Sequence, residues 1–113
     1  MEPLNEQLNV LRQTIDFSPY LSTESRQFLE RQVLQLSVSI SEGVITGNLG
    51  KKLIIELDQK AASDEVHFLM AKISHLNPSS PRLELLQDVS IQLETQRISP
   101  DQTRKEIQKI MRY

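Results

Sequence analysis

The stretch that decides the fold is residues 23–45, which read TESRQFLERQVLQLSVSISEGVI. Wound as an α-helix, at about 100° per residue, it places four apolar residues close to one line: Leu29, Val33, Leu36 and Ile40. A second apolar line, made of Leu34, Val38 and Ile45, falls on roughly the opposite side. Because a helix with two apolar sides needs neighbours on both, we expect this helix to run through the centre of a helical bundle.

The same stretch also fits a β-strand. Apolar and polar residues alternate from residue 34 to residue 41, and strict alternation is typical of a half-buried strand. Apolar segments at 44–45 and 53–55 follow, so strand pairing within residues 34–57 is the alternative. We favour the helix because residues 24–35 are good helix formers and no helix breaker precedes Gly43.

A first helix is predicted over residues 4–16. Its inward side is one narrow apolar line, made of Leu4, Leu8, Leu11 and Ile15. Pro19 then disfavours helix at Ser18 and indicates a connector. Its apolar residues Phe17, Tyr20 and Leu21 are expected to fold back on the core, and Ser22 or Thr23 is expected to cap the helix that follows.

The clearest break in the pattern is GNLG at residues 47–50. It lacks the spacing of a phosphate-binding loop, so we interpret it as a turn. Two helices are predicted beyond it, over residues 51–62 and 64–76, with Ser63 or Asp64 capping the second. Their inward residues are Leu53, Leu57 and Ala61 in the first, and Val66, Leu69, Met70, Ile73 and Leu76 in the second.

Two more helices follow a turn-rich linker at residues 77–81. Ser80 and Pro81 suit the start of a helix that runs to about Arg97. Ser99 and Gln102 have the spacing of a capping box around Pro100, which predicts a last helix over residues 99–111. The inward residues are Leu85, Leu86, Val89 and Leu93, then Thr103, Ile107, Ile110 and Met111.

These elements predict an all-α fold, a bundle of five to six helices in a single domain over residues 1–113 with its central helix near 23–45. The chain is 38% hydrophobic, 25% charged and carries a net charge of −2, which excludes a whole-protein attraction for nucleic acid or anionic lipid. It contains no cysteine and no apolar run near the roughly 20 residues that span a bilayer. We therefore expect a soluble, cytoplasmic protein without a membrane segment.

No group of residues forms a catalytic or metal-binding motif. His67 and His75 are the only histidines, and on one helix their spacing of about 12 Å prevents a shared metal ion. Glu84 and Asp88 lie one helical turn apart, which is a common solvated arrangement. We therefore expect a protein that is not an enzyme and that has no cofactor and no metal site.

The C-terminal segment 99–113 is locally basic. Four cations gather on it: Arg104, Lys105, Lys109 and Arg112. Together with the preceding helix it can be interpreted as a helix-turn-helix, which makes nucleic-acid binding the alternative function. A solvated face explains the same residues better, because the whole chain is acidic.

Apolar residues outside the main stripes suggest another function. Phe68 and Ile91 lie off the stripes of their helices, as does Ile54 or Ile55. Apolar side chains that a bundle leaves on its surface are available to another protein chain. The leading hypothesis is therefore a non-enzymatic interaction module (an adaptor, regulator or assembly factor) that binds a protein partner, or its own copy, through an apolar helix face or groove.

Overall fold

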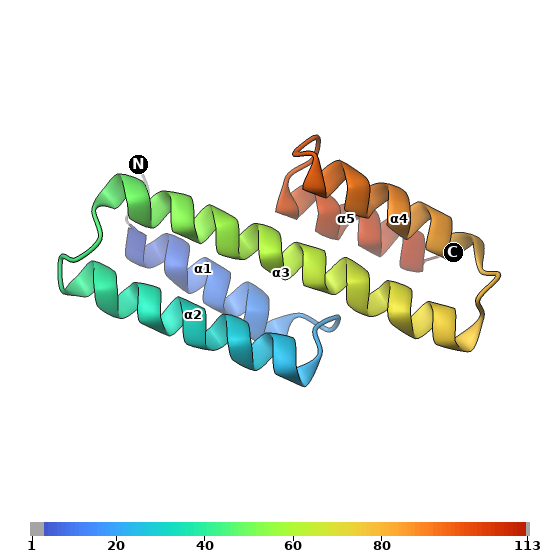
Figure 1. Ribbon diagram of the computed structural model, residues 1–113, viewed down its shortest axis with the longest axis horizontal. Helices are drawn as coiled ribbons and strands as arrows, with labels where there is room; N and C mark the ends of the chain where they lie inside the picture. The colour runs from blue at the N-terminus through green and yellow to red at the C-terminus, as the bar shows by residue number, and fades with distance from the viewer. Residues whose placement is uncertain (1–3, 113) are drawn as a thin grey trace. The chain divides into compact units, whose positions relative to one another are not determined.

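The computed structural model describes residues 4–112, which form five α-helices and, within that range, no strand. The helices are α1 (Leu4–Phe17), α2 (Thr23–Ser41), α3 (Gly47–Leu76), α4 (Pro81–Glu94) and α5 (Pro100–Met111), drawn in Figure 1. The predicted all-α fold and the number of five to six helices are confirmed, and the alternative of strands over residues 34–57 is wrong. The chain divides into two compact units, Met1–Ala61 and Ala62–Tyr113, while the assignment of residues 1–113 to one domain stays a prediction.

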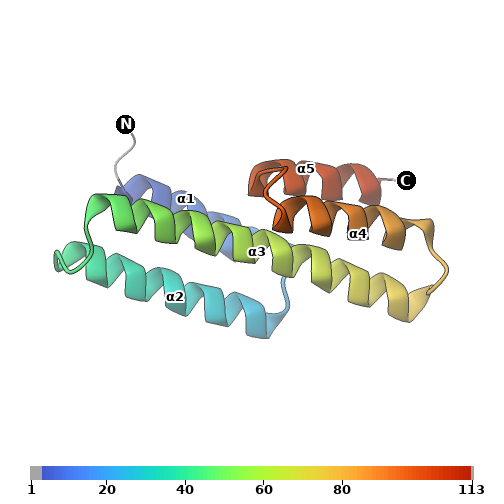
Figure 2. The ribbon, with the colours of Figure 1, turned by 45° about the horizontal axis from the view of Figure 1, so that its top comes forward.

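The first unit is an up-down-up bundle of three helical segments: α1, α2 and the N-terminal half of α3 (Figures 1 and 2). Its core takes one apolar stripe from each segment, as expected of amphipathic helices joined by short connections. The buried residues are Leu8, Leu11, Ile15, Leu21, Leu29, Val33, Leu36, Ile54 and Ala61. Close packing continues at the start of α3, where a Cβ added to Gly50 would lie 3.1 Å from Leu4 Cδ1.

Arg26 and Ser22 fix the connection between α1 and α2. The Arg26 guanidinium donates hydrogen bonds to the carbonyl oxygens of Ile15, Asp16 (2.8 Å) and Ser18 (2.7 Å), which are exposed by the end of α1. The Ser22 hydroxyl accepts from the Ser25 amide at 3.1 Å and caps α2. Carbonyl groups at the end of α1 and an amide group at the start of α2 are therefore hydrogen-bonded, although they have no partner within their own helices.

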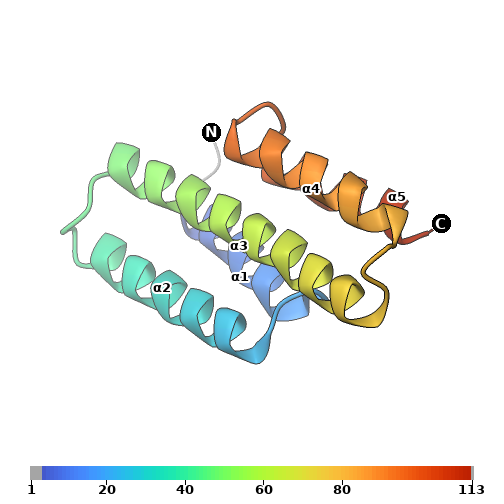
Figure 3. The same ribbon diagram turned by 45° about the vertical axis from the view of Figure 1, so that its right-hand side comes forward.

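The second unit is also an up-down-up bundle, built from the C-terminal half of α3 with α4 and α5 (Figure 2; α3 and α4 are also seen in Figure 3). Its buried apolar residues are Ala62, Val66, Leu69, Leu86, Val89, Leu93, Ile107 and Ile110. The predicted caps of the last two helices are confirmed: Ser80 caps α4, and Ser99 and Gln102 form a reciprocal capping box at α5, with bonds of 3.1 and 3.2 Å.

The predicted central position of the helix near 23–45 is wrong. Only one of its two apolar lines is buried, because Leu34 and Val38 are 59% and 47% exposed. The helix also ends at Ser41, and Gly43 follows with φ of 72°, in the left-handed region that glycine enters without strain. The helix that both units share is instead α3.

The boundaries predicted between 47 and 64 are also wrong. GNLG at 47–50 is the first turn of α3 rather than a break, and the chain turns at residues 42–46 instead. Ser63 and Asp64 lie inside α3 rather than at a cap, since no glycine or proline interrupts the helix there. The predicted helices 51–62 and 64–76 are therefore one helix of 30 residues.

Three residues predicted to point inward are exposed. Phe17, Leu76 and Leu85 are 81%, 74% and 45% exposed. Phe17 and Leu76 are the last residues of α1 and α3, and Leu85 lies beside the buried Leu86. The helix expected to reach Arg97 ends at Glu94.

Candidate functional site

An open groove of about 430 Å³ runs between α2 and the N-terminal half of α3, within the first unit. One wall is formed by Phe28, Gln32, Gln35, Leu36 and Ser39 of α2, the other by Leu53, Glu56, Leu57 and Lys60 of α3, and Ile45 of the connecting loop closes one end. Eleven residues separate Phe28 from Ser39, so the wall on α2 is about 16 Å long, or three helical turns.

The groove has an apolar floor and a polar rim. Leu36 is buried, and Ile45, Leu53 and Leu57 are half-buried and pack on the core of the first unit. The rim amides and hydroxyl come from α2. Glu56 and Lys60 stand one turn apart on α3, so the rim carries both signs of charge and no net charge. A surface with an apolar floor and a polar rim is suited to apolar side chains of a ligand.

Phe28 and Lys60 form the end of the groove opposite Ile45. The Lys60 ammonium lies 5.6 Å from the centroid of the Phe28 ring, within the range of a cation–π contact. The ring is nevertheless 41% exposed. Phenylalanine is among the aromatic residues that are enriched at protein interfaces.

The four residues predicted to bind a partner differ in their exposure to solvent and in the unit to which they belong. Ile54 is 7% exposed and belongs to the core of the first unit, so its assignment to the surface is corrected. Its neighbour Ile55 is 54% exposed. Phe68 is half-buried on α3, and Ile91 is 49% exposed on α4. Ile54 and Ile55 belong to the first unit and Phe68 and Ile91 to the second.

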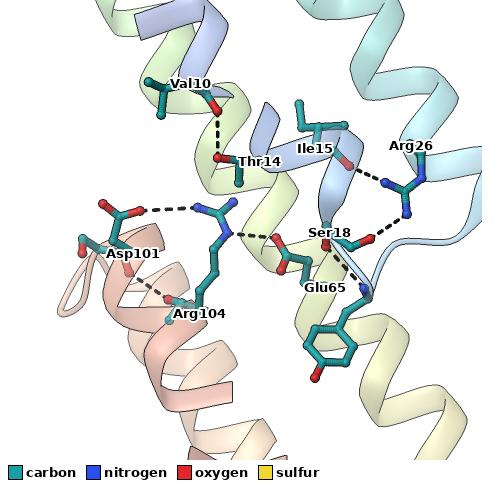
Figure 4. A network of polar contacts seen from close by, with 11 residues as sticks. Val10, Thr14, Ile15, Ser18, Arg26, Glu65, Asp101 and Arg104 are labelled. Atoms are coloured by element: carbon teal, nitrogen blue, oxygen red, sulfur yellow. Dashed lines mark hydrogen bonds and ion pairs between the residues drawn. The ribbon is translucent and has the colours of Figure 1, made fainter. Parts of the chain in front are cut away.

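The predicted basic helix is tied in part to its own unit. Arg104 Nε donates to Glu65 Oε1 at 3.0 Å, and its Nη1 lies 3.6 Å from Asp101 Oδ1 (Figure 4). Glu65 is 4% exposed, so this pair joins α5 to α3 within the bundle. Arg104 therefore has a structural role within the second unit, which makes it less suitable for binding nucleic acid.

Three cations of the same helix remain exposed: Lys105, Lys109 and Arg112. Lys109 forms an ion pair of 3.3 Å with Glu106 one turn away, and such exposed pairs contribute little. Tyr113, the last residue of the predicted basic segment 99–113, lies outside the described residues.

Two carboxylates meet beside a hollow of about 450 Å³ that is lined by Arg12, Ile15, Asp16, Glu30 and Val33. The pKa of Glu30 is raised above its usual value, first because its carboxyl shares a hydrogen bond with Asp16, then because of partial burial and the charge of Asp16. Arg26 acts in the opposite sense.

We expect Glu30→Gln to stabilise the protein at pH 7 and to lose this advantage near pH 4. A raised pKa in the folded state means that stability is gained as the pH falls towards the usual value of about 4.3 and is lost as it rises. The gain is a few tenths of a kcal/mol, because Glu30 is exposed and water screens it. Urea denaturation at both pH values measures it. An equal gain in an Asp16→Asn background would contradict the coupling.

The histidines and acidic residues bring no metal site together within residues 4–112. His67 and His75 are exposed, and His67 Nδ1 lies 3.3 Å from the hydroxyl of Ser63. Over the same range, no three His, Asp or Glu side chains are placed to hold one ion. Glu84 and Asp88 are exposed on α4, as predicted. None of the helices described combines the length and the apolar character needed to cross a membrane.

Sequence reasoning missed the groove because its walls come from two helices whose pairing no local pattern reveals. The usable signal was Phe28, one residue before the buried Leu29 and therefore beside the inward stripe of α2. Comparison of the chain with protein-family models, with curated proteins and with solved structures gives no match.

Proposed function

We propose that this protein is a non-enzymatic interaction module of the cytoplasm that binds an amphipathic helix of a protein partner in the groove between α2 and α3. One observation carries the proposal: the groove has an apolar floor, is open to solvent along three helical turns, and has an exposed aromatic ring at one end. The lack of cysteine fits a reducing compartment.

A helix is the occupant that this shape favours. Two neighbouring helices of a bundle leave between them a furrow with the spacing of a helical side-chain row, and a further helix laid there extends the bundle. The partner helix would place apolar residues at positions i, i+3, i+4 and i+7 over Leu36, Leu53 and Leu57. Its polar side would face water beyond Gln32 and Ser39.

Site-specific photocrosslinking in cells tests the proposal. A photoreactive phenylalanine analogue at Gln32 and, separately, at Glu56 is expected to capture the same segment of one partner, since the two residues line opposite walls. The same analogue at the exposed Glu84 of α4 is the control and should not capture it. Capture of unrelated segments from the two walls, or equal capture from Glu84, would reject the groove as the binding site.

Affinity for the captured segment, made as a peptide, gives the second measurement. Phe28→Ala should weaken binding about tenfold or more, because a partly buried aromatic ring at an interface contributes strongly. Phe17→Ala is the matched control, since Phe17 is exposed on α1 outside the groove. Equal affinities of the two variants would contradict the proposal.

Nucleic-acid binding through α5 is the second candidate, supported by the exposed cations Lys105, Lys109 and Arg112. The engagement of Arg104 by Glu65 and Asp101 weakens it. A gel shift at low salt that disappears in Lys105→Glu/Lys109→Glu would support this candidate. No shift of the unmodified protein at low salt would remove it.

A further inference from the structure

The outer side of α2 is an exposed helix face that the bundle leaves without a neighbour. Arg31, Leu34, Val38 and Glu42 fall within an arc of about 80° on it, and all four are exposed. The buried stripe of Leu29, Val33 and Leu36 lies on the opposite side of the helix. This face is therefore separate from the contacts that hold the first unit together.

The charges on this face are arranged so that the face complements itself. Arg31 precedes Leu34 by three residues, and Glu42 follows Val38 by four. The midpoint between the two charges nearly coincides with the midpoint between the two apolar residues. If a two-fold axis passes through that point, Arg31 of one copy meets Glu42 of the other twice, and Leu34 meets Val38 between them.

The C-terminal end of α2 gives a second reason to expect that another chain covers this face. No cation lies in its last turn, and its C-cap residue, Glu42, places a negative charge at the negative end of the helix dipole. Within residues 4–112 neither Arg31 nor Glu42 forms an ion pair. An arginine brought to this end by another chain would neutralise Glu42 and interact favourably with the negative end of the helix dipole.

We propose that a second copy of this chain covers the outer face of α2, so that two α2 helices pack antiparallel with Leu34 and Val38 at the centre and an Arg31–Glu42 pair at each end. A parallel arrangement would bring like charges together and is disfavoured. The face of one helix is small compared with the roughly 800 Å² per partner of a standard interface, so the dimer is weak and depends on concentration. This inference does not depend on the groove or its partner helix.

Charge exchange between two variants tests the geometry. Arg31→Glu and Glu42→Arg each place two like-charge pairs in their own dimer, and each should weaken self-association at least tenfold. Mixed in equal amounts, the two variants form a heterodimer in which both pairs are again opposite in charge. Sedimentation equilibrium, with one variant carrying a fluorophore, should show association restored to within threefold of the unmodified protein. Loss of this rescue at high salt is expected, because the pairs lie at the rim.

The apolar centre has a matched control. Val38→Asp should abolish the dimer, whereas Val10→Asp, at a valine that is 62% exposed on α1, should leave it intact. Circular dichroism of both variants should match that of the unmodified protein, since neither residue is in the core. A protein that stays monomeric up to about 1 mM, a mixture that forms no heterodimer, or equal weakening by both valine variants would overturn the proposal.

Discussion

Ile54→Asp is expected to lower the free energy of unfolding by about 4 kcal/mol or more, and Ile55→Asp by less than about 1 kcal/mol. The two residues are adjacent in α3, but Ile54 is 7% exposed and Ile55 is 54% exposed. In the first variant a carboxylate replaces a side chain that packs with Leu8, Leu11 and the rest of the core. Burying a charge without a partner is among the most costly single changes known.

Urea denaturation followed by far-UV circular dichroism measures this difference. The loss in Ile54→Asp should become smaller towards pH 4, because a buried carboxyl escapes its desolvation cost by taking up a proton. Ile55→Asp should show no comparable dependence on pH, since its carboxylate stays in water. Similar losses in the two variants would mean that the register of α3 against the first unit differs from the one described.

Arg104→Ala is expected to lower the free energy of unfolding by about 3–5 kcal/mol. The substitution leaves Glu65 in a site where its side chain is only 5% exposed and its guanidinium partner, bound at 3.0 Å, is gone. Lys109→Ala is the matched control in the same helix: its pair with Glu106 has side-chain exposures of 65% and 42%, and its loss should cost less than about 1 kcal/mol.

A double variant separates the cost of an unpaired buried charge from the loss of the Arg104 side chain. Glu65→Leu/Arg104→Leu should recover most of the loss of Arg104→Ala, because apolar side chains in place of a buried pair leave no unpaired charge. Equal stabilities of Arg104→Ala and Lys109→Ala would contradict a structural role for the Glu65–Arg104 pair. A double variant less stable than Arg104→Ala would show that the charges themselves hold α5 in place.

Local signals in the sequence predicted local features well. The Ser99–Gln102 capping box is formed as expected, since both partners lie within one turn and need nothing from the rest of the chain. The inward stripes were also predicted correctly where a neighbour covers the whole helix: Ile107 and Ile110 are 1% and 5% exposed, and Leu8 and Leu11 are 2% and 3% exposed.

Features that depend on distant segments were missed. Nothing in the pattern of residues 23–45 tells whether a second helix covers Leu34 and Val38, and none does. Ser63 and Asp64 resemble a cap, but the alanines before them favour helix and pack in the core, so the chain continues without a break. Glu65 and Arg104 are 39 residues apart, and only the folded bundle makes them partners.

The groove was missed for the same reason, because its two walls come from different helices. Its floor joins Leu36 of one helix to Leu53 and Leu57 of the next. The turn between them was predicted at residues 47–50 but lies at residues 42–46, and the helix boundary predicted at residues 63–64 is absent from α3. Ile54 and Ile55 could not be told apart because both fit a plausible stripe, and only the neighbours of α3 decide which of them is buried.

The boundary between the two units falls between Ala61 and Ala62, in the interior of a continuous helix. A cut there would leave four carbonyl groups without hydrogen-bond partners on one fragment and four amide groups on the other. The fragment that ends at Ala61 would carry no capping residue at its new end, whereas the fragment that begins at Ala62 has Ser63 and Asp64 next to its new end, and both are good N-caps. Division of the chain at this boundary is therefore expected to cost helix stability at both new ends, although each compact unit keeps its own buried residues.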